Sequence, residues 1–181
     1  MIAVFGGSFN PPHLAHLLTV TVVLARYDLE RVLVVPTFQH PFAKALASFE
    51  DRVEMCRLAM GWVPKVEISR VEEELGGESR TLRTLEHLQA KNPGKSFRFV
   101  MGADLMVESA KWYGFDRIKE IAPPIVLGRV GVDYEGAPKP VLPDVSSTEI
   151  RALAGAGKWN EMEALVPRSV VAYIRARNLY A

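Results

Sequence analysis

Short apolar runs alternate along the chain with longer stretches in which apolar residues recur at helical spacing. Strands are predicted at residues 2–5, 31–36, 65–70, 97–101 and 125–127. The first two runs are almost continuously apolar, which is typical of strands that are buried on both faces. Helices are predicted at residues 14–27, 49–62, 80–91, 115–121, 147–153 and 167–178. This alternation predicts an α/β fold, in which helices cover both faces of a parallel sheet.

Three segments without such a pattern are predicted to be irregular, at residues 37–47, 72–79 and 135–143. The second is acidic and contains glycines, and the third holds three prolines. Ser48 and Ser146 are predicted N-caps, because a serine hydroxyl accepts a hydrogen bond from a free N–H of the first helical turn. A chain of 181 residues is expected to form one domain, 1–181, with a small C-terminal helical portion at about 147–181.

Charge and composition narrow the possible partners and the compartment. The formal net charge is +1, which argues against binding to nucleic acid or to an anionic membrane surface. No apolar run approaches the roughly 18 residues of a membrane span, and no signal peptide is expected. Cys56 is the only cysteine, so the chain holds no internal disulfide and a cytoplasmic location is expected.

The segment GGSFNPPHLAH, at residues 6–16, joins the first predicted strand to the first helix. Gly6 and Gly7 let a ligand approach the backbone, because no Cβ intervenes. His13 and His16 are three residues apart at the start of the helix, where free N–H groups favour an anion. Since ligands of parallel sheets bind beyond the carboxyl ends of the strands, this segment predicts a phosphate site.

A metal site or a dinucleotide site fits this segment less well than a phosphate site does. A zinc site would need further ligands at suitable spacing, and Cys56, His40 and His87 do not provide it. The dinucleotide-binding pattern GxGxxG does not fit, and a Walker P-loop is absent. A plain turn with structural histidines stays open as the alternative.

The segment VSSTEIR, at residues 145–151, is a second candidate anion site. Ser146 and Glu149 have the spacing of a capping box, which predicts a helix from Ser147. The N–H groups and hydroxyls of Ser147 and Thr148 would then be available to an anion, and Arg151 would add a cation. The alternative is a capped helix with a solvated arginine.

Taken together, these two segments resemble the signature pair of the (H/T)xGH nucleotidyltransferase superfamily. The segments TLRTLEHL, FVMGADLMVESAKWY, VLGR and LVPRSVVAYIRARNLY further resemble the bacterial nicotinate-mononucleotide adenylyltransferases. The likeness extends over essentially the full chain in the expected order. It implies a Rossmann-like fold of the HxGH type and transfer of AMP from ATP to nicotinate mononucleotide, yielding deamido-NAD and pyrophosphate. It also implies Mg²⁺, held through the ATP phosphates with no direct protein ligand.

The resemblance assigns roles residue by residue. It implies an ATP site formed by Gly7, Ser8, Phe9, His13, His16, Gly102, Asp104, Arg129, Ser146, Ser147, Thr148 and Arg151. It implies a nicotinate mononucleotide site formed by Lys44, Thr81, Asp104, Trp112 and Tyr113. The residues expected to be catalytic are His13, His16, Lys44 and Arg151. The alternatives are that Asp104 only caps a helix, that Lys44 is a solvated lysine, and that Trp112 and Tyr113 form a surface or core pair.

The chain departs from the family pattern at several positions. Ala15 replaces the glycine of the motif, and Arg80 stands where a tyrosine is usual. Lys44 lacks the usual preceding histidine, and Val130 replaces the proline of Arg-Pro-Gly. Alternative functions are therefore an adenylyltransferase acting on nicotinamide mononucleotide or 4'-phosphopantetheine, or a non-catalytic nucleotide-binding regulator. The expected partners are small molecules, without nucleic acid or membrane, and a homo-oligomer is left open.

Overall fold

The computed structural model describes residues 1–40, 46–109, 112–133 and 136–181. Within these ranges six strands form one parallel sheet in the order β3-β2-β1-β4-β5-β6. The strands are β1 (Ile2–Gly7), β2 (Arg31–Pro36), β3 (Val66–Ile68), β4 (Phe97–Gly102), β5 (Pro124–Arg129) and β6 (Pro140–Leu142). The chain therefore starts in the middle of the sheet, winds outward to β3, and then returns to build the other half from β4. The predicted Rossmann-like α/β fold is confirmed.

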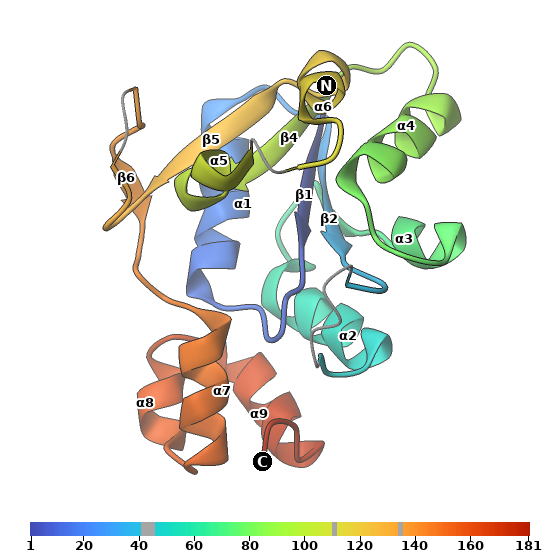
Figure 1. The fold of residues 1–181 in the computed structure, drawn as a ribbon. Coiled ribbons are helices and arrows are strands. Elements are labelled where there is room, and N and C mark those ends of the chain that lie inside the picture. The colour runs from blue at the N-terminus through green and yellow to red at the C-terminus, as the bar shows by residue number, and fades with distance from the viewer. Residues whose placement is uncertain (41–45, 110–111, 134–135) are drawn as a thin grey trace.

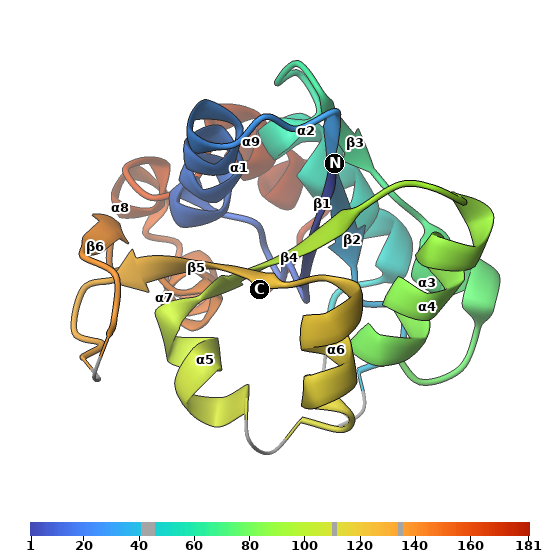
Figure 2. The same ribbon diagram turned by 90° about the horizontal axis from the view of Figure 1, so that it is seen from above.

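Helices cover both faces of this sheet, with α1, α2 and α9 on one side of β1 and α4 and α6 on the other (Figure 2). The helices are α1 (Leu14–Arg26), α2 (Phe49–Met60), α3 (Val71–Leu75), α4 (Thr81–Lys91), α5 (Ala103–Glu108), α6 (Phe115–Ile121), α7 (Ser147–Gly155), α8 (Trp159–Glu163) and α9 (Arg168–Ala176). Among the described residues, none of the helices combines the length and the apolar character that a membrane span requires.

Strand β1 shows why the apolar runs are continuous. Ala3 and Phe5 belong to the core on the face covered by α1, α2 and the C-terminal helices, whereas Ile2 and Val4 belong to the core under α3, α4 and α6. Successive side chains of a strand point to opposite faces, so a strand that is covered on both faces needs apolar residues at every position.

Both predicted serine caps are present. The Ser48 hydroxyl oxygen accepts a hydrogen bond from the Asp51 N–H at 3.0 Å, and α2 begins at the next residue. The Ser146 hydroxyl oxygen accepts from the Glu149 N–H at 3.2 Å, and α7 begins at Ser147. In each helix the cap satisfies a first-turn donor that has no partner within the helix.

Two of the predicted loops contain regular structure. Residues 71–75, mostly inside the loop predicted at 72–79, form α3, which is anchored by the buried side chain of Val71. Arg83, on α4, donates to the carbonyl oxygens of Leu75 and Gly76 and so satisfies acceptors at the end of α3. The acidic composition indicated a loop, but tertiary contacts stabilise a short helix there.

The prediction of a loop throughout 135–143 is also wrong, because Pro140–Leu142 is the edge strand β6. A proline is tolerated at the first position of an edge strand, where its missing N–H is not required. Leu142 is buried in the core. Gly128 on β5 lets the backbone of Pro138 and Lys139, just before β6, come close. A Cβ on Gly128 would lie 2.2 Å from the Pro138 carbonyl oxygen. The short helices α5 and α8 were not predicted from the sequence.

Candidate active site

The candidate site lies at the carboxyl ends of the central strands. Strands β1, β4 and β5 end at Gly7, Gly102 and Arg129. Between β1 and β4 the order of the strands reverses direction, and such a switch point is where open α/β sheets bind ligands. In Figure 1 the end of β1 points toward the helices α7, α8 and α9, so the C-terminal part of the chain lies below this edge.

His13 and His16 form a close pair at the start of α1. Their ring centroids are 3.8 Å apart, and the rings are tilted by 31°. The backbone N–H of His13 donates to Nδ1 of His16 at 3.1 Å. Since a nitrogen that accepts a hydrogen bond carries no proton, neutral His16 holds its proton on Nε2. Nε2 is thus a hydrogen-bond donor.

Both histidines are neutral at physiological pH. Burial, and secondarily the charge of Arg129, lower the pKa of His13 to about 4. Burial, His13 and Arg129 together hold the pKa of His16 well below its ordinary value. The pair can therefore offer polarised N–H groups to a phosphate, while the positive charge of the site comes from the arginines.

The lowered pKa of His13 predicts a dependence of stability on pH. A histidine whose pKa is lower in the folded state favours the unfolded state once the pH falls below its unfolded value near 6.5. Above that pH it has no effect. Between about pH 6.5 and 4 this residue should lower the free energy of unfolding by up to about 3 kcal/mol.

Urea unfolding of the wild type and of His13→Asn at pH 7 and pH 4.5 measures this effect. The variant should lose less stability between the two pH values than the wild type does. Parallel losses in the two proteins would contradict the assignment to His13.

Phe9 supports this pair from the core. Its side chain is 1% exposed and packs edge-on against His16, with the ring centroids 4.9 Å apart. A Cβ on Gly7 would lie 3.1 Å from Phe9 Cζ, so glycine makes room for the ring. Because the side chain of Phe9 is buried, only its backbone can face a ligand. The carbonyl of Ser8 accepts from Nη1 of Arg52 at 3.0 Å.

Asp104 and Arg129 form an ion pair beside the histidines. Arg129 Nη1 lies 3.2 Å from Asp104 Oδ2, and Arg129 Nη2 donates to the Val145 carbonyl oxygen at 2.8 Å. A Cβ on Gly102 would lie 2.3 Å from Asp104 Oδ1, so the carboxylate folds back over this glycine. Gly102 is the N-cap residue of α5, and Asp104 is paired with Arg129 rather than acting as the N-cap.

The start of α7 is bound directly to the N-terminal segment. The Ser147 hydroxyl donates to the Pro11 carbonyl oxygen at 2.9 Å, and Arg151 Nη1 donates to the Asn10 carbonyl oxygen at 2.9 Å. Arg151 Nη2 donates to the Thr148 hydroxyl oxygen at 3.3 Å. The expectation that both hydroxyls are available to an anion is corrected, because the proton of Ser147 is already donated to Pro11. The first N–H groups of α7 have no partner within the helix.

Three of the residues expected to bind the mononucleotide, Thr81, Trp112 and Tyr113, belong to α4 and to the segment just before α6. Thr81 is the first residue of α4, and a Cβ on Gly114 would lie 2.6 Å from Leu82 Cδ2, so α4 contacts the segment after Trp112. Tyr113 is 75% exposed. It lines a hollow of about 450 Å³ together with Glu78, Arg80, Leu82, Arg83 and Glu86.

Trp112 is partly buried. Its ring packs edge-on against Phe99 and Phe115, with centroid distances of 5.9 and 6.1 Å. These contacts match the alternative of core packing for Trp112. Arg80, which replaces the usual tyrosine, forms an ion pair with Glu78 at 2.8 Å.

Comparison with known proteins places the chain in a family. The family model of cytidylyltransferase-like proteins matches residues 4–153. A "Probable nicotinate-nucleotide adenylyltransferase" of Anaeromyxobacter dehalogenans is 49% identical, and the match covers 99% of this chain and 96% of that protein. A protein of the same name from Thermus thermophilus is 36% identical, with 99% and 98% covered. The chain belongs to the nicotinate-nucleotide adenylyltransferase family. The resemblance found in the sequence is thereby confirmed.

A solved structure supports the fold independently. The nicotinic acid mononucleotide adenylyltransferase of Plasmodium falciparum, complexed with NaAD, superimposes with a TM-score of 0.84 at 21% sequence identity. The match covers 99% of this chain and 96% of that one.

Some residues of the site were not predicted from the sequence, and one expected residue cannot be placed. Lys44 lies outside the described residues. Asn10, Arg52 and Tyr180 contact the site segments but were not singled out. Asn10 stands inside the first motif, which could have drawn attention to it. Arg52 and Tyr180 carry no local signal, because their partners are 44 and 170 residues away.

Among the described residues there is no cluster of three or more histidine, cysteine, aspartate or glutamate side chains that could hold a metal ion.

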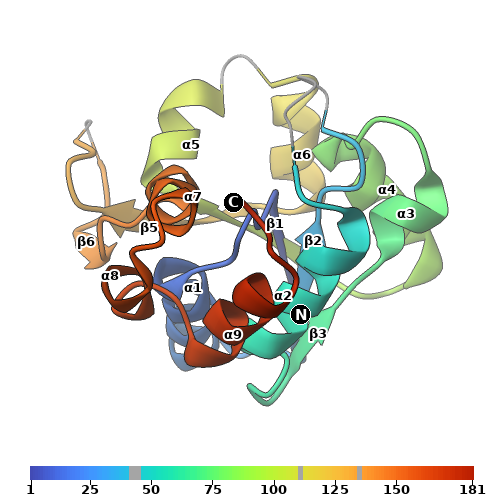
Figure 3. The same ribbon diagram turned by 90° about the horizontal axis from the view of Figure 1, so that it is seen from below.

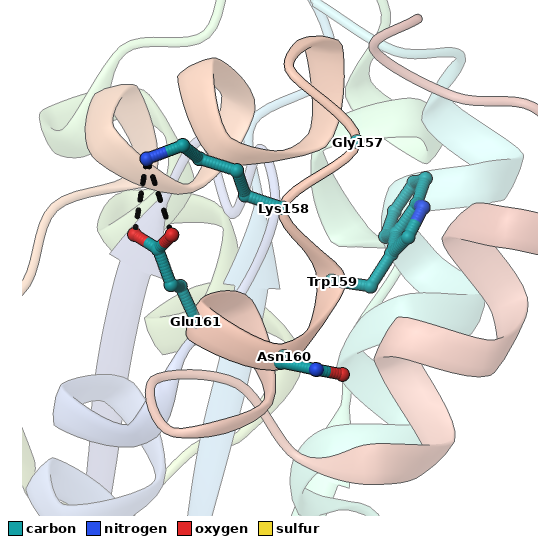
Figure 4. Close-up of a pocket in the computed structure, with 5 residues that line it drawn as sticks. All are labelled: Gly157, Lys158, Trp159, Asn160 and Glu161. Atoms are coloured by element: carbon teal, nitrogen blue, oxygen red, sulfur yellow. Dashed lines mark hydrogen bonds and ion pairs between the residues drawn. The ribbon is translucent and has the colours of Figure 1, made fainter.

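A second hollow, of about 330 Å³, lies apart from these residues in the C-terminal helical portion (Figure 4). It is lined by the consecutive residues Gly157, Lys158, Trp159, Asn160 and Glu161. Lys158 and Glu161 pair with each other at 3.1 Å, and Trp159 carries the guanidinium of Arg175 on its ring. Lys158, Glu161 and Trp159 therefore find partners within this helical portion. None of the five lining residues belongs to the candidate site.

Proposed function

We propose that this chain transfers AMP from ATP to nicotinate mononucleotide, the reaction of the family to which it belongs. The observation that carries this proposal is the convergence of two distant segments at one edge of the sheet. Arg151 donates to Asn10 and Ser147 donates to Pro11, so the arginine of α7 lies beside the segment that holds His13 and His16. A triphosphate needs such a convergence of donors and cations.

The transfer is a direct in-line displacement at the α-phosphorus of ATP. An oxygen of the mononucleotide phosphate forms a bond to this phosphorus, while the bond to the bridging oxygen of the β-phosphate breaks. Pyrophosphate leaves with that electron pair. No protein nucleophile takes part, and Cys56 could not serve as one, because burial raises the pKa of its thiol. Catalysis consists of positioning and of stabilising charge.

Each group of the site has a role in this step. The N–H groups of the neutral histidines donate to phosphate oxygens as charge develops in the transition state. Arg151, the free N–H groups of α7 and the Thr148 hydroxyl hold the β- and γ-phosphates. Arg129 adds positive charge, and its pairing orients Asp104 toward the nucleotide. Lys44 is assigned to phosphate, and Mg²⁺ held by ATP oxygens would neutralise charge on the triphosphate. Thr81, Trp112 and Tyr113 hold the pyridine.

The role of Arg151 is tested by Arg151→Lys. Lysine keeps the charge but cannot span two acceptors as the planar guanidinium does. The KM for ATP should rise about tenfold, the effect of losing one hydrogen bond to a charged group, with little change for the mononucleotide. Initial rates at varied concentrations of each substrate measure both constants. An effect confined to the mononucleotide would place Arg151 in the other subsite.

The activity itself is tested by pyrophosphate release with ATP, Mg²⁺ and one acceptor at a time. Release should require the acceptor and be fastest with nicotinate mononucleotide. Faster release with 4'-phosphopantetheine would assign a different substrate. ATP binding without release in the presence of any of these acceptors would indicate a regulator.

A further inference from the structure

The last residues of the chain reach the candidate phosphate segment at residues 6–16. The hydroxyl of Tyr180 donates to the side-chain oxygen Oδ1 of Asn10 at 2.8 Å, although 170 residues separate the two. Seen from below, the C-terminal end lies under the end of β1 and next to α7 (Figure 3), and Figure 1 shows it among the C-terminal helices. Asn10 itself is 3% exposed, so this hydrogen bond is formed away from bulk water.

Asn10 connects three parts of the chain. Its Oδ1 accepts a second hydrogen bond from the Ala47 N–H at 3.0 Å, so both acceptor positions of the amide oxygen are used. Its backbone carbonyl accepts from Nη1 of Arg151 at 2.9 Å. The orientation of Asn10 therefore fixes where the Arg151 guanidinium lies, and Tyr180 supplies one of the two donors that hold the Asn10 side chain.

Tyr180 is itself held firmly. Its ring is partly buried against the core of the C-terminal helices, and burial raises the pKa of its hydroxyl, which stays protonated and can donate. A Cβ on Gly155, the last residue of α7, would lie 3.2 Å from the Tyr180 carbonyl oxygen. The chain end thus packs against the end of α7 while its hydroxyl contacts Asn10, to which Arg151 of the same helix is bound.

We propose that Tyr180 is a positioning residue for ATP binding. By holding the Asn10 amide, its hydroxyl keeps the Asn10 carbonyl where it orients the Arg151 guanidinium toward the β- and γ-phosphates. This inference rests on the proposed role of Arg151.

Tyr173 provides a matched control on the same C-terminal segment. Its hydroxyl donates to Asp51 Oδ1 at 2.9 Å and links α9 to α2, both of which lie outside residues 6–16 and 145–151. The variants Tyr180→Phe and Tyr173→Phe each remove one hydroxyl and one inter-element hydrogen bond. Only the first should change ATP binding if positioning, rather than stability alone, is the role of Tyr180.

The experiment compares kcat, the KM for each substrate and the midpoint of thermal unfolding in four variants. They are Tyr180→Phe, Tyr173→Phe, Arg151→Lys and the double variant Tyr180→Phe/Arg151→Lys. Tyr180→Phe should raise the KM for ATP about threefold to tenfold, the range for loss of one neutral hydrogen bond, and leave the KM for the mononucleotide within about twofold. Because Tyr180 acts through Arg151, its replacement should have a much smaller effect in the Arg151→Lys background.

The outcomes separate this inference from the proposed function. If Arg151→Lys leaves the KM for ATP unchanged, the role of Arg151 is wrong and the inference falls with it. If Arg151→Lys raises that KM but Tyr180→Phe does not, only the inference is overturned. Equal changes in Tyr180→Phe and Tyr173→Phe, or additive effects in the double variant, would also overturn it.

Discussion

His16→Ala is expected to lower turnover at least ~100-fold while the fold survives. The magnitude is that of one preorganised donor aimed at developing negative charge. The hydrogen bond from the His13 N–H to Nδ1 places the proton of His16 on Nε2, and the edge of Phe9 holds the ring in place. Alanine removes this donor, and no neighbouring group is bonded to Nε2 in the described residues to replace it.

Single-turnover and steady-state rates, with circular dichroism to check the fold, measure this effect. His16→Gln should retain more activity than His16→Ala, because the glutamine amide can bring an N–H donor near the position of Nε2. His87→Ala, on α4 and outside the proposed machinery, is the matched control and should turn over at nearly the wild-type rate. A folded His16→Ala protein with near-normal turnover would refute the assignment.

Nicotinate mononucleotide should be preferred over nicotinamide mononucleotide by roughly fivefold to a hundredfold in kcat/KM. The first N–H groups of α4 have no partner within the helix, and its first turn contains no acidic residue. A carboxylate accepts from every donor there, and the helix dipole favours its charge. An amide would set its NH₂ against one of these donors, and a buried donor left unpaired costs about 1–3 kcal/mol.

Initial rates at sub-saturating concentrations of the two mononucleotides give this ratio directly. Thr81→Val removes the hydroxyl but keeps the backbone N–H, so a reduced preference in this variant would assign part of the selectivity to the hydroxyl. Ser169→Ala, far along the chain on α9, is the control. Equal kcat/KM values for the two mononucleotides, or a preference for the amide, would refute the pyridine site and leave the phosphate chemistry standing.

The sequence by itself determined those features that depend on neighbours along the chain. The apolar runs at 2–5 and 31–36 identified central strands, because a strand covered on both faces has no polar position. Ser48 and Ser146 identified the starts of α2 and α7, because a cap acts on an N–H three residues away. The two candidate phosphate segments, at residues 6–16 and 145–151, were proposed for the same reason, since glycines, histidines and a capped helix start carry their chemistry within one turn.

Only the tertiary structure decided how these segments meet. The edge strand β6 forms because β5 offers it a partner and Gly128 lets the backbone approach, which no local pattern in a proline-rich segment indicates. The side chain of Phe9 lies in the core, where it packs edge-on against His16, because the turn directs it there. The contacts of Arg52 with Ser8 and of Tyr180 with Asn10 join residues far apart in sequence. Such contacts depend on the order of the strands and the path of the chain, which the spacing of residues along a sequence does not encode.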